Sequence, residues 1–192
     1  MQLADLDLNK VYTYADYLKW TFEERVELIK GKIFEMSPAP DRLHQEVAGE
    51  IYHQFKNYLT HKSRRVYIAP FDVRFIQKSK KNTDIITVLQ PDVCVVCDLS
   101  KLDDKGCLGA PDIVIEILSP GNNKKELANK YEAYEEGGVK EYWIADPREK
   151  SVQVYQRIND KFVNSGYLFD TVTSPLLPGF SLDLTVVFKD IS

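Results

Sequence analysis

The chain has 192 residues, 44% of them hydrophobic, and a formal net charge of −4 at pH 7. This length and composition can fill one core of ordinary size, so we expect a single domain over residues 1–192. The negative charge disfavours a protein that coats nucleic acid through a general basic surface, although local basic patches remain compatible with it. No apolar run is long enough for a membrane span, no signal peptide is recognisable, and the odd number of cysteines does not suggest a disulfide framework. We therefore expect a cytoplasmic protein with no membrane partner.

The first third of the chain predicts a short helix, a hairpin and a long helix. Thr13, with Asp16 three residues later, is typical of a helix N-terminus, and this helix would end near residue 21. Apolar runs at 26–29 and 33–36 flank a Lys-Gly-Lys turn and predict a hairpin. After a proline-rich breaker at 37–40, Asp41 can cap a helix over 42–60, whose apolar residues recur every four positions: Leu43, Val47, Ile51, Phe55 and Leu59.

The rest of the chain is rich in strand signals. Three strands are expected at 66–75, 92–97 and 112–118, followed by a Gly-Asn-Asn turn at 121–123 and a helix at 124–136 that ends at two glycines. Further strands are expected at 141–145, 152–155, 162–169 and 182–188. This order predicts an α/β (α+β) fold. A mixed central sheet would be flanked by helices 42–60 and 124–136, with an extra N-terminal hairpin and C-terminal strands.

Two carboxylates lie in strands that are otherwise apolar. Asp92 begins one of these strands and Glu116 lies inside the next. An ionised carboxylate in a strand core costs several kcal/mol unless a cation, a metal or several donors compensate it. Two acids on strands expected to be neighbours therefore predict a functional site. The alternative is that each acid is structural and bonded to loop N–H groups or to an arginine.

Several phrases along the chain resemble one nuclease family. Asp92, Glu116 and a following helix rich in lysine and tyrosine resemble the PD-(D/E)xK nuclease superfamily. The resemblance narrows to the bacterial putative restriction endonuclease family called Uma2-like, and it covers nearly the whole chain. The phrases that carry it are Phe34-Glu35-Met36-Ser37-Pro38-Ala39-Pro40 with His44, Pro91-Asp92-Val93, Ile115-Glu116-Ile117-Leu118-Ser119-Pro120, Lys130 with Tyr131 and Tyr134, the stretch from Gly138 to Pro147, and Leu177-Pro178-Gly179-Phe180.

One position departs from the superfamily pattern. The superfamily's third strand usually carries a lysine two residues after its acid, but Leu118 occupies that position here. The resemblance implies that the lysine has moved into the next helix, where it would be Lys130. Strand and helix rises place Glu116 and Lys130 at a similar height, each roughly 10 Å from the intervening turn. We expect Leu127, Ala128, Tyr131 and Tyr134 to form the helix's apolar stripe, with Lys130 on its flank.

These residues suggest a metal-dependent endonuclease that hydrolyses DNA. Asp92, Glu116 and the backbone carbonyl of Ile117 would present hard oxygen ligands to Mg²⁺ or Mn²⁺. Lys130 would position the attacking water or stabilise charge on phosphorus. His44 is a candidate contact for the metal's water shell or a phosphate, and Asp72 is a possible third acid from the preceding strand.

Other interpretations remain open at this stage. Lys130 could pack its stem along the helix with a solvated amine, His44 could be bonded to backbone, and Asp72 could be a strand-end acid. The missing strand lysine and the negative charge favour a nuclease-like fold that binds nucleic acid or protein without cleaving. A metal-free acid pair, as in glycosidases, would leave Lys130 without a role. Because both strands of a duplex are most easily cut by two sites on a two-fold axis, we expect a homodimer.

Overall fold

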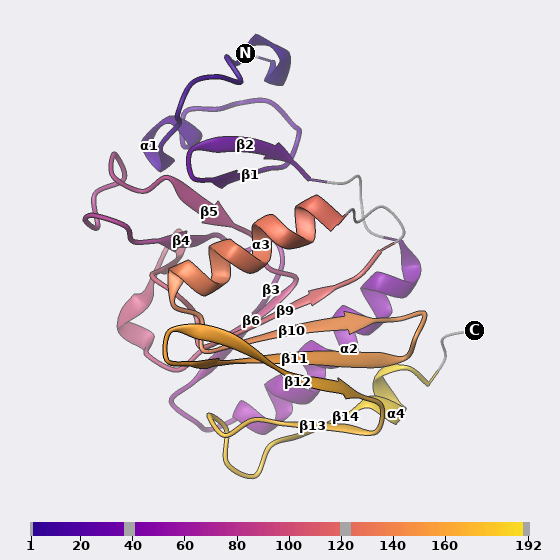
Figure 1. Cartoon of the computed structure of the whole chain (residues 1–192). Coiled ribbons are helices and arrows are strands. Elements are labelled where there is room, and N and C mark those ends of the chain that lie inside the picture. The colour runs from indigo at the N-terminus through magenta and orange to yellow at the C-terminus, as the bar shows by residue number, and fades with distance from the viewer. Residues whose placement is uncertain (1, 37–40, 120–123, 190–192) are drawn as a thin grey trace.

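Two six-stranded sheets dominate the computed structural model, which describes residues 2–36, 41–119 and 124–189 (Figure 1). The N-terminal sheet has the order β2 (Lys32–Glu35), β1 (Val26–Ile29), β5 (Thr87–Leu89), β4 (Val73–Phe75), β8 (Gly106–Leu108) and β7 (Leu102–Asp103). The central sheet has the order β12 (Lys161–Leu168), β11 (Ser151–Ile158), β10 (Glu141–Asp146), β9 (Ile113–Ile117), β6 (Val93–Val96) and β3 (Arg65–Ile68).

The central sheet is mixed, as the sequence predicts. Strand β9 pairs antiparallel with β6, with Val93 opposite Ile115, and parallel with β10, with Glu116 opposite Ile144. The strand that follows Asp92 and the strand that contains Glu116 are therefore neighbours. Because residues alternate between the faces of a strand, Ile115 and Ile117 face one side of the sheet, while Val114 and Glu116 face the other.

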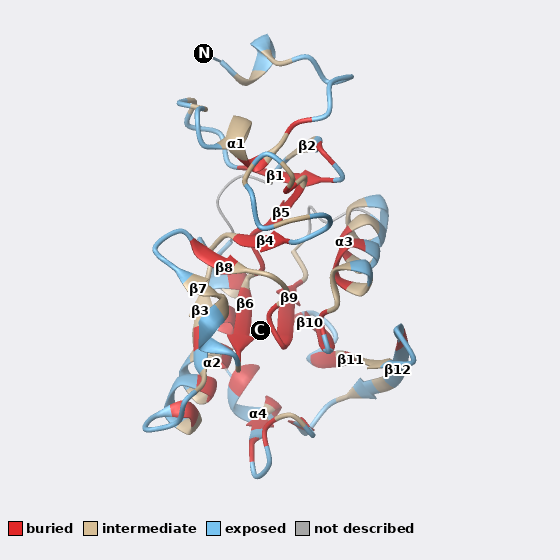
Figure 2. Cartoon of the chain, turned by 90° about the vertical axis from the view of Figure 1, so that its left-hand side faces the viewer, coloured by how far each residue is buried: buried red, intermediate tan, exposed pale blue. Residues whose placement is uncertain are grey.

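The two long helices lie on opposite faces of the central sheet. Helix α2 (Arg42–Leu59) packs Val47, Ile51 and Phe55 into the cluster that contains Ile113, Ile115 and Trp143. Helix α3 (Lys124–Gly137) packs Ala133 and Tyr134 into the cluster that contains Val114 and Tyr142. The same cluster takes in Ile29 and Phe75 of the N-terminal sheet, so α3 lies between the two sheets and the N-terminal hairpin contributes to its environment (Figures 1 and 2).

Local signals set the ends of the N-terminal elements. The Thr13 hydroxyl accepts the Asp16 amide and caps α1 (Tyr14–Tyr17), and the Asp41 carboxylate accepts the His44 amide at 2.8 Å to cap α2. Positive φ angles of 52° at Lys30 and 76° at Gly31 make the tight turn of the β1–β2 hairpin. These elements match the sequence prediction, except that α1 is shorter than expected.

Two strand predictions are wrong in their extent. The expected strand at 66–75 is two strands in different sheets, β3 and β4, because Pro70 lies between them and has no amide to donate to a sheet. The expected strand at 182–188 is the short β14 (Ser181–Asp183), paired with β13 (Thr171–Thr173), followed by helix α4 (Leu184–Val187). Asp183 caps α4 by accepting the Thr185 and Val186 amides.

Several short elements carry no clear sequence signal. These are β5, β7, β8, β13 and the 3₁₀ turns Leu3–Asp5 and Leu99–Lys101. The predicted breaker at 37–40 and turn at 121–123 lie outside the described residues. Within the described residues, no helix has the length and apolar character needed to cross a membrane.

Candidate active site

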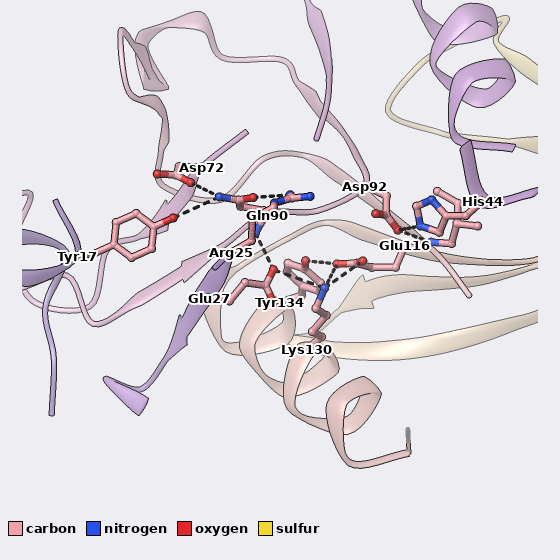
Figure 3. Close-up of polar contacts among 11 residues, drawn as sticks. Tyr17, Arg25, Glu27, His44, Asp72, Gln90, Asp92, Glu116, Lys130 and Tyr134 are labelled. Carbon is pink, nitrogen blue, oxygen red and sulfur yellow. Dashed lines mark hydrogen bonds and ion pairs between the residues drawn. The ribbon is translucent and has the colours of Figure 1, made fainter. Parts of the chain in front are cut away.

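Glu116 lies at the centre of a buried polar cluster (Figure 3). Its position in β9 turns its side chain towards α3, and only 5% of the residue's surface is exposed. Both of its carboxylate oxygens lie 3.2 Å from the ammonium of Lys130, and Oε1 also accepts the hydroxyl of Tyr134. The acid is therefore satisfied by two donors from one helix, spaced four residues apart on the same face.

Lys130 is a buried residue, 6% exposed, on the face of α3 that meets the sheets. The predicted apolar stripe is wrong here, because Ala128 is exposed and Lys130 occupies the buried face itself, beside Ala133 and Tyr134. Besides Glu116, its ammonium faces Oε1 of Glu27 at 3.5 Å. The lysine thus lies between one carboxylate from the central sheet and another from the N-terminal sheet.

Asp92 joins the ends of β6 and β9. Its Oδ2 accepts the Ile117 amide at 2.8 Å and lies 3.0 Å from Nε2 of His44. Its Oδ1 has no hydrogen-bond partner among the described residues. His44 is buried in the first turn of α2, and its Nδ1 has no partner in the described part of the chain. Because Nε2 faces a carboxylate, the geometry places a proton on Nε2, which donates to Asp92.

Glu27 is a site residue that the sequence reasoning missed. It is 4% exposed in β1, a strand of four buried residues, and its Oε1 accepts the backbone N–H of Gln90 at 2.8 Å. The signal was present in the sequence, because Val26-Glu27-Leu28-Ile29 is an acid within an apolar strand, the same criterion that selected Asp92 and Glu116. Tyr134 was expected only as an apolar contact, and nothing in the sequence assigned its hydroxyl to Glu116.

Asp72 does not join this cluster. It lies in the turn between β3 and β4, where it accepts the Gln90 side-chain amide at 2.9 Å and the Tyr14 hydroxyl at 3.3 Å. Burial raises its pKa above the usual aspartate value. Gln90 links it to the site only indirectly, because the side chain of Gln90 bonds Asp72 while its backbone bonds Glu27. The expectation that Asp72 is a third acid beside Asp92 and Glu116 is not supported by this arrangement.

The cluster holds more negative than positive charge. Burial, and then repulsion from Asp92 and Glu27, raise the pKa of Glu116 against the opposing effect of Lys130. Burial likewise raises the pKa of Glu27. Burial disfavours the charged form of Lys130, but Glu116, Glu27 and Asp92 outweigh it and raise the pKa of the ammonium. Two carboxylates, Glu116 and Glu27, thus share one lysine, and Asp92 adds further negative charge nearby, so the cluster favours another cation.

A cleft of about 500 Å³ opens onto these side chains. Glu27, His44, Asp92, Glu116 and Lys130 all line it. Its remaining wall is mixed in charge and partly apolar, and its lining residues include Arg25, Lys125, Glu35, Glu126, Phe34, Met36, Ile68 and Pro70. A solute that enters the cleft therefore meets positive side chains and the acidic cluster in the same cavity.

The donor chemistry fits a hard divalent cation. Asp92 and Glu116 supply carboxylate oxygens, the surplus negative charge favours a cation, and one oxygen of Asp92 is without a partner among the described residues. These side chains do not form a complete coordination shell, because no group of three or more His, Cys, Asp or Glu side chains in the described ranges could hold a metal by itself. Backbone carbonyls, water and substrate oxygens would have to complete the coordination, as is common for Mg²⁺.

Cys94 and Cys97 are free thiols that pack into clusters on opposite faces of β6, so they do not converge on a metal.

Comparisons with known proteins identify the fold and the family of this chain. In the solved structures, a crystal structure titled as a putative nuclease belonging to DUF820 from Anabaena variabilis ATCC 29413 shares the fold, with a TM-score of 0.71 and 22% sequence identity over 93% of this chain and 98% of that one. No curated protein matches the chain. The family model described as Uma2, putative restriction endonuclease, matches residues 14–186. This match includes Glu27, His44, Asp92, Glu116 and Lys130, and the chain therefore belongs to the Uma2 family of putative restriction endonucleases.

Proposed function

We propose that this nuclease-family protein is a metal-dependent endonuclease that hydrolyses phosphodiester bonds of DNA. The observation that carries the proposal is the contact between Lys130 and Glu116 beside Asp92, inside a cleft. Two acids and a lysine in this grouping have the composition of a phosphodiesterase centre, although the lysine comes from the helix rather than the strand. The basic side chains of Arg25 and Lys125 on the cleft wall suit a polyanionic substrate.

The metal would be Mg²⁺ or Mn²⁺, held by Asp92, Glu116 and the backbone carbonyl of Ile117. When bound, it would polarise the phosphodiester and lower the pKa of a coordinated water. The Asp92 carboxylate is already oriented for this role, because the Ile117 amide and His44 both hold its Oδ2. Tyr134 fixes Oε1 of Glu116 in the same way.

Lys130 would stabilise negative charge that develops on the phosphate oxygens. Its ammonium is buried, so its field is weakly screened by water, and its raised pKa keeps it charged at neutral pH. His44 would act through Asp92, by holding the Oδ2 oxygen of that carboxylate in place.

A binding module without cleavage is the second candidate. It is favoured by one observation, namely that Lys130 and Tyr134 of α3 both donate to the Glu116 carboxylate and so occupy part of its capacity to bind a cation. In that case the same cleft would bind nucleic acid or a protein partner, and divalent cations would have no effect on binding.

A cleavage assay separates the two candidates. Supercoiled plasmid, linear duplex and single-stranded DNA are incubated with the protein in Mg²⁺, Mn²⁺ or EDTA, and Glu116→Gln serves as the inactive control. We expect cleavage of at least one substrate with a divalent cation, and none in EDTA or with the variant. Binding of DNA without cleavage in every condition, by both proteins alike, would support the binding module instead.

A further inference from the structure

Lys130 is shared between two carboxylates that belong to different sheets. It lies 3.2 Å from Glu116 of β9 and 3.5 Å from Glu27 of β1 (Figure 3). Both acids are almost fully buried, so neither interaction is strongly screened by water. Glu27 is separated from Lys130 by more than a hundred residues in the sequence, and the hairpin that carries it lies outside the sheet that carries Asp92 and Glu116.

Glu27 is itself held firmly. The backbone N–H of Gln90 donates to Oε1 of Glu27 at 2.8 Å, and the side chain of Gln90 is fixed in turn by Arg25 at 2.7 Å and Asp72 at 2.9 Å. A carboxylate fixed in this way offers a constant position for its negative charge. Lys130, by contrast, has a flexible four-carbon side chain, and the position of its ammonium depends on the charges around it.

A divalent cation changes the balance around Lys130. If the cation takes the charge of Glu116 and Asp92, Lys130 loses its closest anion and gains a repulsive neighbour. A buried ammonium without a counter-charge would move out of the site. Glu27 does not belong to the proposed metal ligands, so its charge remains for the lysine.

On this basis, and resting on the proposed endonuclease function, we propose that Glu27 is a positioning residue that keeps the Lys130 ammonium in place when a divalent cation occupies Asp92 and Glu116. It acts through Lys130 and touches neither the metal nor the phosphate. The hairpin β1–β2 is then a functional part of the active centre, rather than an addition to the nuclease core.

A double-mutant cycle tests this role in cleavage. Glu27→Gln keeps the size of the side chain and an acceptor for the Gln90 amide but removes the charge. We expect it to lower kcat about 10-fold while the KM for DNA changes less than about 2-fold, since positioning acts on the chemical step. In a Lys130→Ala background the same substitution should have no further effect, because the residue it positions is gone. An equal loss in both backgrounds would overturn the proposal.

A second variant and a matched control guard against a structural explanation. Glu27→Asp keeps the charge and should retain more activity than Glu27→Gln, and the reverse order would contradict the role of charge.

Glu141→Gln alters another buried strand acid, bonded to Ser174 and Trp143 instead of a lysine. It should lower thermal stability and leave the activity of the folded protein unchanged. If it reduced cleavage as much as Glu27→Gln, the effect would be one of stability alone.

The position of the Lys130 ammonium can also be tested without DNA, so that the role of Glu27 is measured separately from cleavage. In protein labelled with ¹⁵N-lysine, a buried and paired ammonium exchanges its protons slowly and gives an NMR signal that Lys130→Ala assigns by its loss. We expect Mg²⁺ to leave this signal in the parent and to abolish it in Glu27→Gln. A signal that survives Mg²⁺ in Glu27→Gln would overturn the positioning role. A parent that keeps the signal but never cleaves DNA would instead refute the nuclease function.

Discussion

At the scale of single residues, Lys130 is the group on which the chemistry depends most. Lys130→Ala should lower cleavage by roughly 10²-fold, the usual scale for losing one electrostatic stabiliser, while the fold remains intact. Lys130→Arg should rescue poorly, because a planar guanidinium does not replace a compact ammonium shared by two fixed carboxylates. Single-turnover cleavage, with circular dichroism as the folding control, measures both variants.

Lys125 provides the matched control for Lys130. It lies on the same helix and lines the same cleft, but it is exposed. Lys125→Ala should weaken DNA binding modestly and reduce the salt dependence of binding, with kcat nearly unchanged. If Lys125→Ala abolished cleavage and Lys130→Ala did not, the lysine would have been assigned to the wrong position.

Glu116 makes the stability of the metal-free protein depend on pH. Its pKa is raised from 4.5 to about 8, chiefly by burial, so the folded state binds the proton more tightly than the unfolded state does. The stability that this proton contributes is complete below about pH 4.5 and is lost as the pH rises to about 8. The free energy of unfolding in EDTA, measured with urea, should therefore fall across this range.

The corresponding variant and metal measurements test the same assignment. Glu116→Gln, which cannot titrate, should show a shallower decline in the free energy of unfolding over the same pH range. Mg²⁺ should stabilise the parent more at pH 8 than at pH 6, because the metal competes with the proton on Glu116. An identical pH profile for the parent and Glu116→Gln would contradict the raised pKa.

Some site residues could be predicted from the local sequence pattern and others could not. Asp92 and Glu116 interrupt apolar strands, and the rises of strand and helix placed Lys130 level with Glu116, a contact that the structure contains. Glu27 leaves the same kind of signal, but its hairpin seemed peripheral. The Tyr134 hydroxyl and the His44–Asp92 contact depend on side-chain orientation across elements, which no local pattern encodes.

At the scale of elements, two helical glycines should respond oppositely to substitution. A Cβ atom at Gly49 of α2 would meet nothing within 4 Å, whereas one at Gly137, in the last turn of α3, would overlap the ring of Phe75. Gly49→Ala should raise stability by about 0.5–1 kcal/mol, the usual difference in helix propensity. Gly137→Ala should lower stability by about 1–3 kcal/mol through overpacking against β4.

Thermal and urea unfolding of these two variants check the packing of α3 between the sheets. Because Gly137 is two turns from Lys130 on the same helix, Gly137→Ala should also reduce cleavage, while Gly49→Ala should not. Equal stability of both variants would mean that α3 does not approach β4 as closely as the structure has it.

Element prediction failed where the chain changes sheet. The run 66–75 is apolar or aromatic apart from Asp72 and Arg74, and nothing in its periodicity separates β3 from β4, which lie on either side of Pro70. Strand β5 gains its hydrogen bonds from β1 and β4, in other parts of the chain, and its three residues give too little local pattern to detect. Strands β7 and β8 form a hairpin with each other, but they are equally short. The long helices were predicted well because the cap at Asp41 and the repeat along α2 are local.

At the scale of the whole molecule, the main surprise is the second sheet. The hairpin was expected as an addition to one central sheet, but it joins β4, β5, β7 and β8 in a sheet of its own that covers α3. This sheet brings Glu27 to Lys130, so the site is formed between the two sheets rather than on one. Such an arrangement follows from pairing between distant short strands, and the sequence does not encode it in any single segment.

The whole-molecule prediction that remains is the homodimer. Strand β12 is an edge of the central sheet, eight residues long, and it exposes Val163 (46%) and Tyr167 (61%). Long edges with exposed apolar residues tend to pair with another chain, and a two-fold pair of sites would suit cleavage of both strands of a duplex. Light scattering at tens of micromolar should give the dimer mass, and Val163→Lys with Tyr167→Lys should shift it to monomer. Leu8→Lys changes an exposed apolar residue of the N-terminal segment and should leave the dimer unchanged. If the parent protein is monomeric at this concentration, the prediction of a homodimer is refuted.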